Sequence, residues 1–157
     1  MRACSVGTFC NSAVAEKMTL RFEASCPQGI CPGWSVIVKG ERGFSGKNFE
    51  INFLTDSEDK TAFHLKPCFA EDTIICNSFL SGGWGHEERT DPSPLEANEP
   101  FQIEIHSDSE HFLVFINDSM SIQYRHRMKH FSGITKLRIL NDINISSVEI
   151  SKREINE

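Results

Sequence analysis

The sequence predicts an all-β protein, a two-sheet antiparallel β-sandwich of jelly-roll-like form with about eleven strands. Short runs of alternating polar and apolar residues recur along the chain, separated by turn residues, which is typical of sandwiches and barrels. No stretch of about 10–12 residues keeps the 3.6-residue period of a helix. The 12 Phe against one Tyr favour a dry interior, because Phe carries no polar group that must be satisfied.

The first three expected strands cover residues 19–24, 34–40 and 49–55. The first alternates polar and apolar side chains, and the second follows a segment with two Pro and two Gly, which are turn signals. In the third, Phe49, Ile51 and Phe53 share one face, because successive side chains of a strand point to opposite sides.

The middle of the chain supplies three further strands, at residues 61–67, 73–78 and 84–89. A charged turn precedes the first of them. Ser81, Gly82 and Gly83 predict a tight bend before Trp84, and a segment with two Pro at residues 91–94 ends the region.

Five strands are expected in the second half, at residues 101–106, 111–116, 120–124, 136–140 and 145–150. Asn117 and Asp118 predict a two-residue turn between the second and third of these. The chain shows no internal repeat and no linker, so we expect one compact domain over residues 18–157. We expect residues 1–17 to form a flexible N-terminal extension.

The cellular compartment is predicted from what the sequence lacks. No segment reaches the length of a membrane span, and residues 1–17 contain no apolar core of signal-peptide length. The six cysteines show neither C-x-x-C nor Cys/His metal spacing, and the domain is large for a disulfide-dependent scaffold. We therefore expect a cytoplasmic protein with reduced thiols and no membrane insertion.

Nucleic-acid binding and catalysis find little support. The formal net charge of −6 offers no basic surface for DNA or RNA. Glu87 and Glu88 are adjacent and would face opposite ways on a strand, which argues against an acid/base pair. His64 and Cys68 lie roughly 13 Å apart along one strand, too far for a nucleophile and its base. We expect no catalytic residue, no metal and no cofactor.

A ligand-binding surface is the better-supported interpretation of residues 64–89. His64, Lys66 and Cys68 should point the same way along one strand. An exposed Trp84 among His, Asn, Glu and Arg suits a sugar, because indole stacks on the apolar face of a pyranose and polar groups bond its hydroxyls. The alternative is ordinary strand chemistry, in which Trp84 is a core or edge residue and Glu87 and Arg89 form a solvated pair. Residue chemistry alone leaves both open.

The same residues resemble the carbohydrate signature of the galectin family, which reads His-x-Asn-Pro-Arg, then Asn, then Trp-Gly-x-Glu-x-Arg. Here it stands as His64-Leu65-Lys66-Pro67-Cys68, Asn77 and Trp84-Gly85-His86-Glu87-Glu88-Arg89. The resemblance runs from about residue 18 to residue 153. Segments 20–24, 31–36 and 134–137 are similar to the lens-type branch of the family.

The resemblance implies a galectin-type sandwich with a β-galactoside groove and neither metal nor catalysis. It implies that His64 bonds the axial hydroxyl of galactose and that Asn77 and Glu87 hold its primary hydroxyl. Trp84 would stack under the ring. Glu87 and Arg89 would reach the second sugar of a lactose-like disaccharide.

Two positions depart from the signature. Lys66 replaces Asn and offers only donors, whereas Asn offers both donors and an acceptor. Cys68 replaces Arg and removes a five-donor fork. Losing one hydrogen bond to a charged group costs roughly 1.5–3 kcal/mol, which is about one to two powers of ten in affinity. We therefore expect β-galactoside binding to be weak or lost.

Three functions follow from this resemblance. The first is a lens-type, crystallin-like structural protein with a degenerate sugar site. The second is a working β-galactoside lectin that crosslinks glycans as a dimer, with non-classical export as in the family. The third is an interaction module for protein partners in a crowded cytosol. The resemblance also implies a homodimer formed through edge strands near the two chain ends, for which residues 19–22 and 148–150 are the candidates.

Overall fold

The computed structural model describes residues 18–152 of the 157-residue chain. The extension predicted over residues 1–17 lies outside the described residues, as do residues 153–157. The described part forms twelve strands and one short 3-10 helix, η1 (Phe131–Gly133). No helix between residues 18 and 152 has the length and apolarity that crossing a membrane requires.

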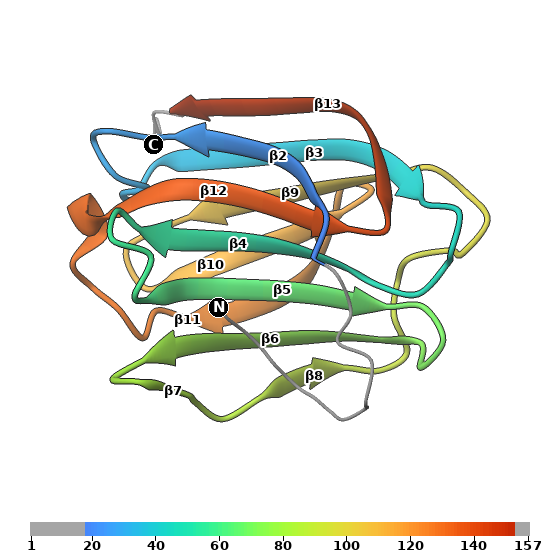
Figure 1. Ribbon diagram of the computed structural model, residues 1–157, viewed down its shortest axis with the longest axis horizontal. Coiled ribbons are helices and arrows are strands. Elements are labelled where there is room, and N and C mark those ends of the chain that lie inside the picture. Colours follow the sequence, from blue (N-terminus) through green and yellow to red (C-terminus); the bar gives the residue numbers. More distant parts are fainter. Residues whose placement is uncertain (1–17, 153–157) are drawn as a thin grey trace.

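Two antiparallel sheets lie face to face, so the predicted fold class is confirmed (Figure 1). The larger sheet has the order β2-β12-β4-β5-β6-β7, with β8 also paired to β6. Its strands are β2 (Leu20–Ser25), β12 (Ile134–Asn141), β4 (Phe49–Thr55), β5 (Thr61–Cys68), β6 (Thr73–Leu80), β7 (Gly83–Trp84) and β8 (Glu88–Thr90).

The second sheet has five strands in the order β11-β10-β9-β3-β13. They are β11 (Ser119–Arg125), β10 (His111–Ile116), β9 (Phe101–Ser107), β3 (Trp34–Arg42) and β13 (Ile143–Lys152). Within the described residues, β2 and β13 are edge strands of their respective sheets. An edge strand leaves backbone N–H and C=O groups available to a further strand.

The predicted strands all form, with one difference at residues 84–89. This segment is two short strands, β7 and β8, separated by irregular backbone at residues 85–87. The two predicted hairpin turns have the left-handed backbone that such turns need: φ is 54° at Ser81 and 78° at Gly82, and 50° at Asn117 and 72° at Asp118.

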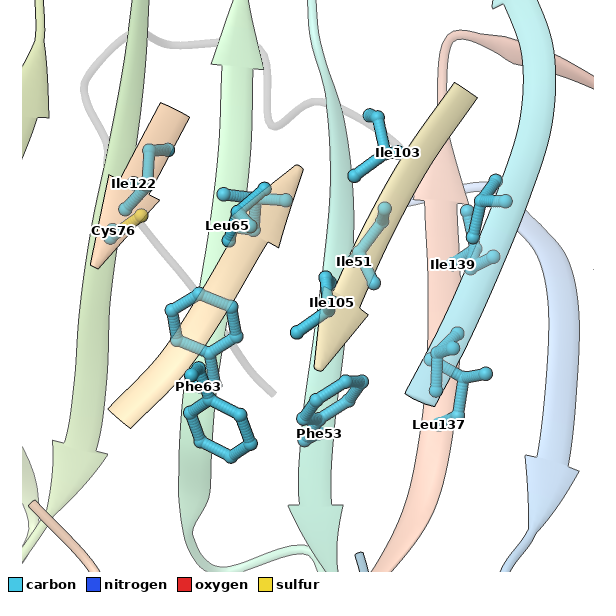
Figure 2. Packing of buried hydrophobic residues seen from close by; sticks show 14 of the residues in the cluster. Ile51, Phe53, Phe63, Leu65, Cys76, Ile103, Ile105, Ile122, Leu137 and Ile139 are labelled. Carbon is cyan, nitrogen blue, oxygen red and sulfur yellow. The ribbon is translucent and has the colours of Figure 1, made fainter. Parts of the chain in front are cut away.

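The interior between the sheets is built from Phe and aliphatic side chains. The ring of Phe63 lies 4.8 Å, centroid to centroid, from that of Phe112 on the opposite sheet, and the ring of Phe53 lies 5.3 Å from the same partner. Figure 2 shows Ile105 of β9 beside Ile51 and Phe53 of β4, with Phe63 and Leu65 of β5 in the neighbouring row. Because Phe63 and Leu65 point inward, the alternation of β5 directs His64, Lys66 and Cys68 to the outer face of the larger sheet.

Candidate functional site

The pairing of β5, β6 and β8 gathers the predicted residues on one outer surface. His64 lies opposite Asn77 on β6. Lys66 lies opposite Ile75, which in turn lies opposite Arg89 on β8. Side chains that are up to 25 positions apart in the chain (from 64 to 89) therefore lie in neighbouring rows of the sheet.

His64 is held from β4 by a chain of hydrogen bonds. Its Nδ1 lies 2.7 Å from Oδ1 of Asn52, and Nδ2 of Asn52 donates to Oε1 of Glu50 at 3.1 Å. Since Asn52 presents its oxygen to the ring, Nδ1 of His64 carries the proton and donates. In the neutral ring, Nε2 is then an acceptor for a ligand group that donates.

The surroundings of His64 favour that neutral ring. Burial lowers the pKa of His64, since only 12% of the side chain is exposed, and the cation of Lys66 lowers it further. The carboxylates of Glu50 and Glu87 oppose these effects. The ring is therefore a hydrogen-bond acceptor at neutral pH.

Asn77 is 4% exposed, and its carboxamide joins β6 to the loop between β7 and β8. Its Nδ2 donates to the carbonyl of Gly85 at 3.0 Å, while its Oδ1 accepts from the backbone N–H of Ser78 at 2.7 Å. Arg127 donates to the same Oδ1 at 3.0 Å. These bonds fix the amide group and the loop that leads to Glu87.

Trp84 stands at the outer edge of the surface and is 50% exposed. Its ring lies 4.7 Å from the imidazole of His64 and 5.3 Å from the ring of Phe79, its partner across the hairpin. The indole is thus supported by two rings and keeps half of its surface open, as a stacking platform requires.

Glu87 and Arg89 form an ion pair at the edge of this surface. Nε of Arg89 donates to Oε1 of Glu87 at 3.1 Å, and its Nη1 lies 3.8 Å from Oε1 of Glu71. About half of each side chain in the Glu87–Arg89 pair is exposed (49% and 46%), so the pair adds little to stability. Its value is to keep a carboxylate and a guanidinium together at this edge of the surface.

The seven residues form an open sheet surface. Two surface hollows, of about 630 and 360 Å³, lie elsewhere, and none of the seven lines either one. Within residues 18–152, no group of three or more His, Cys, Asp or Glu side chains is arranged to hold a metal ion. The arrangement can offer stacking on Trp84 and hydrogen bonds from His64, Asn77 and the Glu87–Arg89 pair.

The comparison with known proteins decides what kind of surface this is. A family model for galactoside-binding lectins matches residues 21–150. The chain belongs to this family, the galectins. It is 42% identical over 138 residues to mouse Grifin, which covers 88% of this chain and 95% of that protein.

Two further relatives extend the comparison. Human Grifin is 37% identical over 136 residues, covering 87% of this chain and 94% of that protein. Dog Galectin-3 is 35% identical over 136 residues, covering 85% of this chain and 45% of that protein. The similarity to Grifin agrees with the lens-type branch indicated by the sequence.

The two departures from the galectin signature lie side by side on β5. Sγ of Cys68 lies 3.7 Å from the backbone carbonyl of Lys66 and points its weak donor at its own strand. Burial raises the pKa of the Cys68 thiol, so it is protonated and uncharged at neutral pH. This galectin therefore lacks a β5 guanidinium beside Glu87.

Sequence reasoning missed four residues that support the site: Glu50, Asn52, Phe79 and Arg127. Because Phe49, Ile51 and Phe53 share the inner face of β4, alternation puts Glu50 and Asn52 on the outer face, but their contact with His64 depends on the β4–β5 register. Arg127 lies 50 positions from Asn77 in a loop, and no sequence pattern marks such a contact.

Proposed function

We propose that this galectin is a lens-type, crystallin-like structural protein whose β-galactoside site is weakened or lost. The proposal rests above all on the Cys68 thiol, which turns to its own backbone where the family signature has an arginine fork. An acidic, single-domain sandwich suits packing at high concentration in a cytoplasm, which is where we propose that the protein resides. We propose that it is not an enzyme.

Calorimetric titration with lactose tests the weakened site. We expect the natural protein to bind weakly or not at all, and the variant Lys66→Asn with Cys68→Arg to gain about ten- to a hundredfold in affinity. No gain in a well-folded double variant would contradict the roles given to these two positions.

A working β-galactoside lectin is the second candidate. The observation in its favour is that His64, Asn77, Trp84, Glu87 and Arg89 are all held on one face by neighbouring side chains. Retention on a lactosyl column with specific elution by lactose would establish this function and overturn the first. Protein partners that bind without sensitivity to lactose would instead favour an interaction module.

Assembly and domain boundaries belong to the same proposal. We propose a homodimer through β2 and β13, the edge strands, and an independently folding unit at residues 18–157. Sedimentation at micromolar concentration tests the homodimer. Unfolding of a shortened chain that starts at Met18 tests whether residues 18–157 fold independently. A monomer in sedimentation, or loss of cooperative unfolding in the shortened chain, would contradict the corresponding part.

A further inference from the structure

Arg127 reaches the site from the loop that follows β11, a strand of the opposite sheet. Its Nη1 donates to Oδ1 of Asn77 at 3.0 Å. Its Nη2 donates to the carbonyl of His86 at 2.7 Å and to Oε2 of Glu88 at 3.1 Å. Its Cζ lies 4.7 Å from the ring centroid of Tyr124. Only 23% of the side chain is exposed, so the guanidinium is held on all these contacts at once.

These contacts use up the acceptor capacity of Asn77. Its Oδ1 has two lone pairs, and the N–H of Ser78 and the guanidinium of Arg127 take both. Its Nδ2 has two N–H groups, and the carbonyl of Gly85 takes one. Asn77 can therefore meet a ligand with one donor and with no acceptor.

We propose that Arg127 is a positioning residue that fixes this polarity, so that the ligand group at Asn77 must accept a hydrogen bond. The proposal rests on the proposed galactoside site, where a hydroxyl can accept from Asn77 and donate to the carboxylate of Glu87. His64 has the opposite requirement, since its Nε2 accepts. The surface thus takes a ligand that donates at His64 and accepts at Asn77.

Gly85 provides independent support for the role of Arg127. A Cβ atom at Gly85 would lie 2.9 Å from Nη1 of Arg127 and 3.4 Å from Oδ1 of Asn77. The loop therefore packs directly on the guanidinium and the carboxamide, at a position where a side chain would displace one of them. Arg127 acts on Asn77 and on the loop backbone at residues 85–88 together.

The first test needs no ligand. In the full chain, NMR reports the side-chain amide protons of Asn77, and we expect shifted signals with slow solvent exchange for the proton on the Gly85 carbonyl. Arg127→Met should move these signals toward free-amide positions and speed the exchange. The matched control is Arg125→Met, because Arg125 is 66% exposed and pairs with Glu110, away from the site. Unchanged Asn77 signals in Arg127→Met would overturn the proposal.

A second variant keeps this test decisive if Arg127→Met does not fold. Arg127→Lys retains the charge, but one ammonium on a flexible stem cannot hold Asn77, His86 and Glu88 in the geometry of a planar fork. We expect the same change in the Asn77 signals, in a protein whose remaining spectrum is preserved. Native Asn77 signals in Arg127→Lys would contradict the need for the fork.

The second test uses methyl β-galactoside and its 6-deoxy analogue, which lacks the primary hydroxyl. Both are titrated into the Lys66→Asn, Cys68→Arg background with and without Arg127→Met. We expect Arg127→Met to cost about tenfold in affinity for the hydroxylated sugar and little for the analogue. Equal losses for both sugars would overturn the proposal. If no variant binds sugar while the Asn77 signals change as expected, the galactoside function fails and the positioning role stands.

Discussion

Nδ1 of His64 lies 2.7 Å from Oδ1 of Asn52, its partner across the β4–β5 register. The proton on this bond leaves Nε2 free to accept, and Glu50 keeps the Asn52 amide from turning over. The hydrogen-bonding face of the histidine is therefore set by two residues of the neighbouring strand.

Asn52→Leu tests this arrangement. Without the amide oxygen, the imidazole loses its fixed tautomer and orientation, so we expect about a tenfold loss of lactose affinity in the Lys66→Asn, Cys68→Arg background. Calorimetry measures the loss, and Asn144→Leu on the exposed part of β13 is the matched control. Equal affinity in the two variants would show that Asn52 does not set the geometry of His64.

Lys66→Met is expected to raise the pKa of His64. The cation of Lys66 lowers that pKa, and its removal leaves the carboxylates of Glu50 and Glu87 acting on the ring. An NMR titration of the imidazole signals measures the change in free protein, with Lys39→Met on β3 as the control. An unmoved or lowered pKa would mean that the ammonium lies farther from the ring than the strand geometry places it.

The stability of the protein should decrease below about pH 6.5 because of His126. This residue is 4% exposed and packs between Phe112 and Phe131, and burial lowers its pKa below the ordinary 6.5. Between the lowered pKa of the folded protein and the ordinary pKa of the unfolded chain, the unfolded chain binds more protons at this residue. The contribution of His126 to the free energy of unfolding is therefore fully present above pH 6.5 and is lost as the pH falls through this range.

Urea unfolding across this pH range provides the measurement. His126→Gln can keep the hydrogen bond to the carbonyl of Asp108 and removes the titration. We expect a shallower dependence of the unfolding free energy on pH in this variant. His64→Gln serves as a second comparison, because burial also lowers the pKa of His64. If the unfolding free energy depends on pH equally in wild type and His126→Gln, the titration of His126 is not the cause of the pH dependence.

Two phenylalanines should differ sharply when shortened. Phe63 is fully buried against Phe112, so Phe63→Ala should lower the unfolding free energy by about 3–5 kcal/mol. Phe44 is fully exposed in the loop between β3 and β4, so Phe44→Ala should change it by less than about 0.5 kcal/mol. Denaturant titration compares the two. Similar losses would mean that Phe44 is covered in solution.

The fold was predictable because local signals agree with the tertiary arrangement. Period-two alternation predicts the strand at residues 49–55, and Asn117 and Asp118 predict the turn that they form; both predictions need only local sequence. The break within residues 84–89 was not visible in this way. It depends on Asn77 and Arg127, which bind the carbonyls of Gly85 and His86 from outside the segment.

The site residues that lie on a single strand were predictable from the sequence, whereas their contacts with residues distant in the chain were not. Alternation alone put His64, Lys66 and Cys68 on one face. The partners of His64 required the register between β4 and β5, which periodicity does not give. The hydrogen-bond polarity of Asn77 required a guanidinium from the other sheet, and a lone Arg in a loop carries no signal of its target.

The burial of thiols has a consequence for how the protein ages. Burial raises the pKa of Cys26, Cys68 and Cys76, so each holds very little thiolate, the form that oxidants attack. At position 68, where the galectin signature has arginine, the thiol therefore adds little oxidative reactivity to this face of the sheet, because burial keeps it protonated.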